Sequence, residues 1–73
     1  MVDVKKLRSR MVLMGYTQKT LVAEMNERGV KTSENTFSSK MNGKSQFDCE
    51  DADVICDILK VDHPAEKADI FLA

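Results

Sequence analysis

The sequence predicts an all-α fold, a compact bundle of four helices followed by a short fifth helix. Apolar residues recur at three- and four-residue intervals in successive segments. Residues typical of helix N-caps and glycines typical of helix ends separate these segments, and no segment alternates apolar and polar residues as a strand would. The 73 residues, of which 42% are apolar, suffice for one small core, so residues 1–73 are expected to form a single domain.

The first helix is expected over residues 3–14, with Asp3 as its N-cap. Gly15, which follows, can adopt the left-handed conformation that ends a helix. The apolar residues at helical spacing define the face that should be buried: Val4, Leu7, Met11 and Met14.

A second helix, at about 18–28, begins after the N-cap Thr17 and ends at Gly29. Its buried stripe should consist of Leu21, Val22 and Met25. Val30 is expected to fill a gap in the core from the connection that follows.

The third helix, at about 33–41, is expected to begin after Thr32 or Ser33 and to end at the Asn42-Gly43 turn. Phe37 and Met41 fall on one side of it. The opposite side carries short polar side chains and no carboxylate: Asn35, Ser38, Ser39 and Asn42. Such a face can enter the major groove of DNA, where asparagine pairs well with an adenine edge. A helix face that simply faces solvent is the alternative interpretation.

The fourth helix should open at Asp48, with Asp51 completing an imperfect capping box. Its apolar face combines four residues at helical spacing with one neighbour: Ala52, Ile55, Cys56, Leu59 and the adjoining Ile58. Pro64 can start a short fifth helix. The apolar end of the chain, Ile70, Phe71 and Leu72, either packs on the chain's own core or forms a dimer or partner surface.

The net charge of −1 is the sum of two unlike halves. Residues 1–47 carry nine Lys or Arg and four Asp or Glu, a net charge of +5, whereas residues 48–73 carry two and eight, a net charge of −6. The basic half favours an anionic partner. The acidic half, with Asp51 and Asp53 near the start of the fourth helix, suggests contact with a basic protein surface as well, and an acidic face that simply faces solvent is the alternative interpretation.

Phosphate contacts are expected on either side of the third helix. The N-terminus of the second helix offers free amide groups and Gln18, and Lys44 follows the Asn42-Gly43 turn. Further cations lie on the same two helices or their connection: Lys19, Lys31 and Lys40. Together these residues predict a helix-turn-helix that lies on DNA.

Other classes of protein are disfavoured. The sequence lacks a glycine-rich phosphate loop, a metal-ligand spacing and a histidine beside a nucleophile, so we expect neither an enzyme nor a cofactor or metal site. No apolar run is long enough for a membrane helix and no secretory signal is present, which predicts a cytoplasmic protein without membrane contact. Cys49 and Cys56 lie too far apart on one helix for a disulfide.

Two stretches of the chain resemble the lambda-repressor-like helix-turn-helix family. Residues 17–22 read Thr-Gln-Lys-Thr-Leu-Val and residues 36–44 read Thr-Phe-Ser-Ser-Lys-Met-Asn-Gly-Lys, close to the family's Thr-Gln-x-x-Leu-Ala, Thr-Ile-Ser-x and Asn-Gly-Lys. The downstream stretch, from Phe47 through Val61 to Phe71, is similar to small Cro-like regulators and modulators of repression from temperate phages of Gram-positive bacteria. The resemblance covers nearly the whole chain.

The resemblance implies a regulator of the lysogenic switch that binds operator DNA in the bacterial host, as a homodimer on two half-sites. Gln18 would contact a phosphate, and the bases would be read by Asn35, Thr36, Ser38 and Ser39. The alternative that it implies is an anti-repressor that acts by contact with a phage repressor protein. The chain departs from the family between Gln18 and Phe37, where extra residues must lengthen the second helix or the turn after it.

Overall fold

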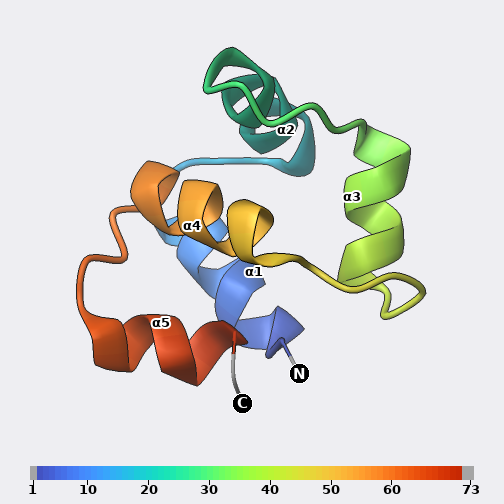
Figure 1. Cartoon of the computed structure of the whole chain (residues 1–73). Helices are drawn as coiled ribbons and strands as arrows, with labels where there is room; N and C mark the ends of the chain where they lie inside the picture. The colour runs from blue at the N-terminus through green and yellow to red at the C-terminus, as the bar shows by residue number, and fades with distance from the viewer. Residues whose placement is uncertain (1, 72–73) are drawn as a thin grey trace.

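The computed structural model describes residues 2–71, and within that range it contains five α-helices and no strand. The helices are α1 (Val4–Leu13), α2 (Gln18–Glu27), α3 (Glu34–Met41), α4 (Cys49–Ile58) and α5 (Pro64–Phe71). Helix α2 packs on α3 and α4, and α1 packs on α5 (Figure 1). The prediction of an all-helical fold with four helices and a short fifth is confirmed, and each helix lies within about two residues of its expected bounds.

Each of the first four helices begins with a side-chain cap. Asp3, Thr17, Ser33 and Asp48 have extended backbones, and the side chain of each accepts a hydrogen bond from the amide three residues later. In α2 the cap is reciprocal, because the hydroxyl oxygen of Thr20 accepts a bond of 2.8 Å from the amide of Thr17. Such caps satisfy amides that the helix itself leaves without acceptors, which explains why the helices start at these residues.

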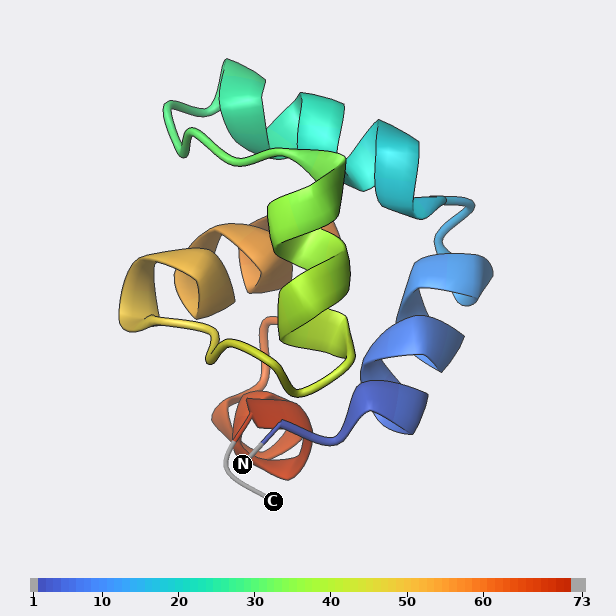
Figure 2. The same cartoon turned by 90° about the vertical axis from the view of Figure 1, so that its right-hand side faces the viewer.

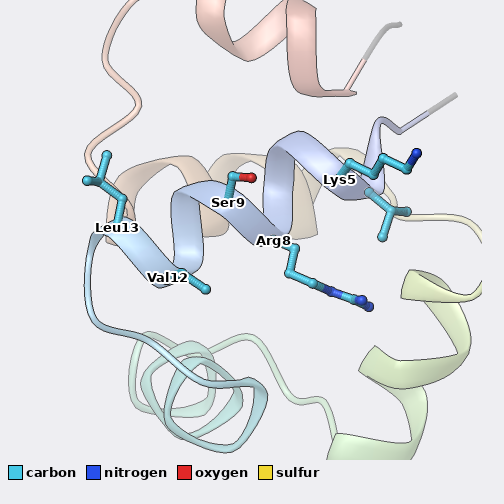
Figure 3. A pocket seen from close by; sticks show the side chains of 6 residues that line it. Lys5, Arg8, Ser9, Val12 and Leu13 are labelled. Carbon is cyan, nitrogen blue, oxygen red and sulfur yellow. The ribbon is translucent and has the colours of Figure 1, made fainter.

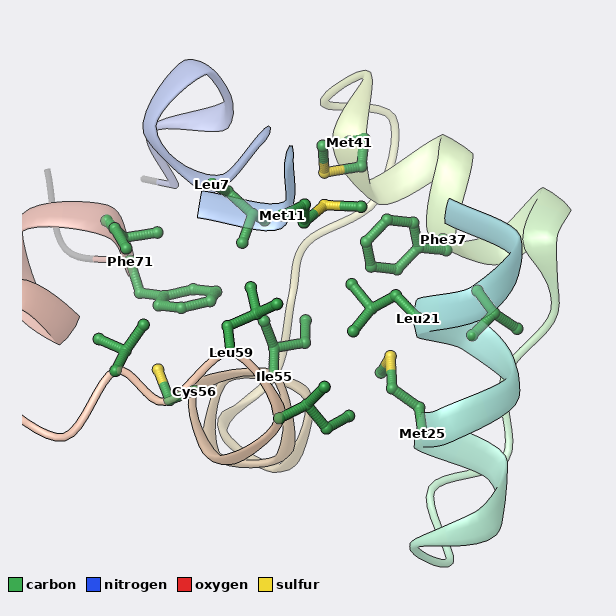
Figure 4. Close-up of a cluster of buried hydrophobic side chains, with 14 residues drawn as sticks. Leu7, Met11, Leu21, Met25, Phe37, Met41, Ile55, Cys56, Leu59 and Phe71 are labelled. Atoms are coloured by element: carbon green, nitrogen blue, oxygen red, sulfur yellow. The ribbon is translucent and has the colours of Figure 1, made fainter. Parts of the chain in front are cut away.

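The core is formed by the apolar stripes that the sequence predicts (Figure 4). Its buried members come from all five helices and from the segment after α4: Leu7, Met11, Leu21, Val22, Met25, Phe37, Met41, Ile55, Cys56, Ile58, Leu59, Val61, Ile70 and Phe71. Val30 and Ala52 pack against this cluster. Phe47 lies edge-on to two other rings, with centroid distances of 5.8 Å to Phe37 and 6.1 Å to Phe71, a favourable aromatic geometry.

The apolar end of the chain belongs to this core. Ile70 and Phe71 are only 7% and 8% exposed, and the carbonyl of Ile70 accepts a hydrogen bond of 2.6 Å from the amide of Asp3. The expectation that Ile70 and Phe71 form a partner or dimer surface is therefore wrong, and the alternative, packing on the chain's own core, holds. Leu72, the third residue of that prediction, lies outside the described residues.

The C-terminus of α4 is held by a side chain from α1. The guanidinium of Arg10 donates hydrogen bonds from Nε to the carbonyl of Leu59 at 3.1 Å and from Nη2 to that of Lys60 at 2.9 Å. A cation at this end of a helix also interacts favourably with the helix dipole. Arg10 is therefore a structural residue that fixes α1 against α4.

Lys60 has a φ of 57° and is the only non-glycine residue with a positive φ in the part of the chain that the structure describes. A side chain in this left-handed conformation costs about 1–2 kcal/mol, which glycine avoids. We expect Lys60→Gly to raise the free energy of unfolding by about 0.5–1 kcal/mol, because the greater flexibility of glycine in the unfolded chain offsets part of the gain. Urea denaturation followed by circular dichroism measures the change, and a loss of stability would contradict the prediction.

The two cysteines are free, as the sequence predicts. Cys49 is exposed at the start of α4, whereas Cys56 faces the core. Burial raises the pKa of the Cys56 thiol, which keeps this side chain neutral and apolar in the folded protein.

Candidate nucleic-acid interface

The connection between α2 and α3 is longer than the three- or four-residue turn that is usual in helix-turn-helix motifs. Helix α2 ends at Glu27 and α3 begins at Glu34, so six residues, 28–33, form the connection. The side chain of Asn26 holds this connection in place: its Nδ2 donates to the carbonyls of Val22 and Thr32, and its Oδ1 accepts from the amide of Thr32, all at 2.9–3.0 Å. The connection is thus ordered by a residue of α2.

Helix α3 presents its polar face outward. Phe37 and Met41 are buried against the core and anchor the inner side of the helix. Figure 2 shows α3 at the front of the molecule, with no other element covering its outer side. Asn35 and Asn42 are exposed, and Ser38 and Ser39 are partly exposed. The Nδ2 of Asn42 lies 3.4 Å from the Oγ of Ser38, which places these two side chains on one face.

The first turn of α3 contains two side chains that change the expected site. The hydroxyl of Thr36, a predicted base reader, lies 3.0 Å from the cap oxygen of Ser33, so it already takes part in the N-terminal cap. Glu34, which the sequence prediction did not include, is exposed in the same turn. Its carboxylate would repel phosphates nearby and would favour a donor such as the exocyclic amine of cytosine.

The N-terminus of α2 offers amide donors beside Gln18. The capping box between Thr17 and Thr20 occupies the amides of those two residues. Among residues 2–71, the amides of Gln18 and Lys19 have no acceptor, and the side chain of Gln18 is partly exposed. Free amides at a helix N-terminus are favourable for a phosphate oxygen.

The carbonyl of Ser39 accepts two hydrogen bonds that hold the turn after α3. The amide of Lys44 donates to it at 2.9 Å and that of Ser45 at 3.4 Å, and Gly43 supplies the positive φ of 78° that the reversal needs. The side chain of Lys44 is exposed and has no ion pair with any residue that the structure describes. Lys44 is therefore available to a phosphate beside the C-terminus of α3.

Lys40 does not belong with the other predicted cations. Lys19 and Lys31 are exposed and without an ion pair in the range 2–71, but the ammonium of Lys40 pairs with the carboxylate of Asp51. The side chain of Lys40 is only 16% exposed. Lys40 therefore does not add to the positive charge of Lys19 and Lys31 as expected, because a buried carboxylate on α4 already binds its charge.

Asp51 is likewise a structural residue. It is 4% exposed, the one buried charged residue among those described. Its carboxylate pairs with Lys40 and accepts a hydrogen bond from the amide of Asp48. The expectation that Asp51 contacts a partner at the surface is therefore wrong. The capping box of Asp48 and Asp51, expected to be imperfect, is complete.

Asp53, the other predicted acidic contact, is exposed and forms an ion pair with Lys67 of α5. The hydrogen bond to Asp53 raises the pKa of Lys67. Asp57, further along α4, pairs with Arg28 in the connection before α3. Three of the four acidic residues of α4, Asp51, Asp53 and Asp57, thus form ion pairs within the chain.

The part of the chain that the structure describes holds no cluster of three side chains able to bind a metal ion, and none of its helices is long and apolar enough to cross a membrane. No protein-family model, curated protein or solved structure matches the chain.

Proposed function

We propose that the protein is a sequence-specific DNA-binding regulator of the Cro type and that α3 enters the major groove. The outer face of α3 carries this proposal: it is uncovered, its central side chains are short and polar, and two buried residues hold it rigidly. Asn35 is the best-placed base reader, since it is exposed and asparagine makes two hydrogen bonds with adenine. Ser38 and Ser39 are weaker discriminators on the same face.

Phosphate contacts from both ends of the helix-turn-helix support the proposal. Gln18 and the free amides of α2 lie at one end, and Lys44 lies at the other. Lys19 and Lys31 add exposed positive charge. Because Lys40 is neutralised within the chain, a single protomer has few cations for phosphates, and we propose that two protomers bind two half-sites about one helical turn apart.

Selection of the full chain against a random duplex library, followed by fluorescence anisotropy on the enriched sequence, tests this function. We expect Asn35→Ala to weaken binding about 5- to 100-fold on that sequence, as the loss of a bidentate base contact does, with little effect on a random duplex. Lys44→Gln should weaken both complexes and lower the salt dependence by about one counterion. Glu66→Gln on the exposed side of α5 is the control and should leave binding unchanged. Failure to enrich any sequence at low salt would contradict the proposal.

The alternative, an anti-repressor that binds a phage repressor through the acidic start of α4, has weaker support. Asp51 is buried, and Asp53 and Asp57 are paired with Lys67 and Arg28. Among the acidic residues of α4, Glu50 alone is both exposed and without an ion pair to any residue in the range 2–71. We therefore place DNA binding first.

A further inference from the structure

The outer side of α1 carries the two most exposed large apolar side chains of the described chain. Val12 and Leu13 are each 72% exposed, whereas Leu7 and Met11 of the same helix are buried. Figure 3 shows Val12 and Leu13 near the C-terminal end of α1, with Lys5, Arg8 and Ser9 along the same helix. Together with Val4, these residues line a shallow open depression, which we call the α1 outer face: Val4, Lys5, Arg8, Ser9, Val12 and Leu13.

Two of the four cations of α1 already have partners within the chain. Lys6 is paired with Asp69 at 2.7 Å, and Arg10 caps α4 through two carbonyls. Lys5 and Arg8, by contrast, are exposed and have no ion pair with any residue in the range 2–71. The α1 outer face itself contains no acidic residue, and Glu66 and Asp69 of α5 border it only on the side of Lys5, Ser9 and Leu13. The face therefore carries two cations without an ion pair next to exposed aliphatic carbon.

A second copy of this chain does not match the α1 outer face. A two-fold contact of this face with itself would bring four cations into one interface without an acidic residue among its lining residues. A contact with the acidic side of α4 would be heterologous and would compete with the ion pairs of Asp53 and Asp57. Charge complementarity thus favours a different protein.

We propose that the α1 outer face binds an acidic amphipathic helix of another protein. Aliphatic side chains one turn apart on that helix would pack against Val12 and Leu13, and its carboxylates would pair with Lys5 and Arg8. Ser9 lies between these two groups and is small enough to allow a close approach of the partner helix. This surface acts independently of DNA binding by α3, because none of its residues belongs to the proposed DNA contacts.

The test uses the uniformly ¹⁵N-labelled full chain and a synthetic helical peptide of about four turns, with leucine at positions i, i+4 and i+7 and glutamate at the flanking positions. A matched peptide has lysine in place of each glutamate. We expect saturable amide shifts that are centred on α1 with the acidic peptide, and binding about tenfold weaker or absent with the basic peptide. Leu13→Ser and Arg8→Glu should each weaken binding of the acidic peptide by about tenfold without altering the thermal midpoint.

Lys19→Glu on α2 is the matched control for Arg8→Glu, because it makes the same kind of charge reversal on another helix. Equal loss with both variants would mean attraction by net charge only and would overturn the proposal. Saturable shifts away from α1, or none, would overturn it as well. Vesicles of phosphatidylserine and phosphatidylcholine form a separate arm: vesicle binding that depends on Leu13 and Arg8, without peptide binding, would assign the α1 outer face to a membrane surface instead.

Discussion

Phe37→Ala is expected to lower the free energy of unfolding by about 3–5 kcal/mol, the usual cost of emptying a fully buried phenylalanine site. Phe37 has no exposed surface, and Figure 4 shows its ring among Met11, Met41 and Leu21. The substitution also removes the edge-on contact with Phe47. A domain of 73 residues has a total stability of about 4–11 kcal/mol, so much of the population should be unfolded at low urea concentration.

Urea denaturation followed by circular dichroism measures this effect, with Asn35→Ala as the matched control. Asn35 lies two residues earlier in α3 and is exposed, so its replacement should change the stability by no more than about 0.5 kcal/mol. The pair of variants separates the inner side of α3 from its outer side: Phe37 holds the helix, whereas Asn35 is the proposed base reader. A loss of less than about 1 kcal/mol for Phe37→Ala would show that the core closes around the cavity and that α3 is not anchored as described.

The sequence predicts the helices well because the signals that define them are local. An N-cap acts on the amide three residues later, and a buried stripe is recognised by spacings of three and four, so both lie within one or two turns of chain. Ser33, as one of two suggested caps, and Phe37, as the inner residue of α3, were identified in this way. The outward polar face of α3 follows from the same periodicity.

The roles of the charged residues depend on contacts that are far apart in the sequence. Lys40 and Asp51 are eleven residues apart, and Arg10 reaches carbonyls 49 and 50 residues away. Composition and spacing show only that these side chains are charged. Which of them is neutralised within the fold depends on the side-chain contacts that join α3 to the start of α4 and α1 to the residues after α4. The prediction from the sequence therefore counted Lys40 among the exposed cations and Asp51 among the exposed acids, although the two side chains pair with each other.

The long connection before α3 could be predicted only in part from the sequence. The sequence shows that residues are added between Gln18 and Phe37 but leaves open whether the helix or the turn takes them. In the structure, the amide side chain of Asn26 bonds to both Val22 and Thr32 and so ties the connection to α2. Because asparagine is common on helix surfaces for other reasons, only the fold shows that its side chain bridges the connection.

Asp51→Ala is expected to destabilise the protein by about 3 kcal/mol. The substitution leaves the ammonium of Lys40 without its partner in a largely buried position, and removal of one member of such a pair typically costs about 3–5 kcal/mol. It also removes the acceptor for the amide of Asp48. The estimate takes the lower end of the range because Lys40 retains some exposure and can move toward solvent.

Three further variants measured by urea denaturation separate these contributions. Asp53→Asn, two residues later and exposed, is the control and should cost less than about 1 kcal/mol, as expected for a surface ion pair. Asp51→Asn keeps an oxygen for the amide of Asp48 but removes the charge, so it should destabilise less than Asp51→Ala. Lys40→Met keeps the aliphatic packing. Combining it with Asp51→Asn should restore part of the lost stability, because no unpaired charge remains.

Lys40→Met also distinguishes a structural role of the pair from a role in DNA binding. If the pair only orients α3 on α4, Lys40→Met should leave the salt dependence of DNA binding nearly unchanged, because a neutralised ammonium displaces no counterion. Lys44→Gln, four residues later and exposed, should lower that salt dependence by about one counterion. Equal decreases for the two lysines would mean that Lys40 leaves Asp51 for a phosphate in the complex, and α3 would then bind DNA without this link to α4.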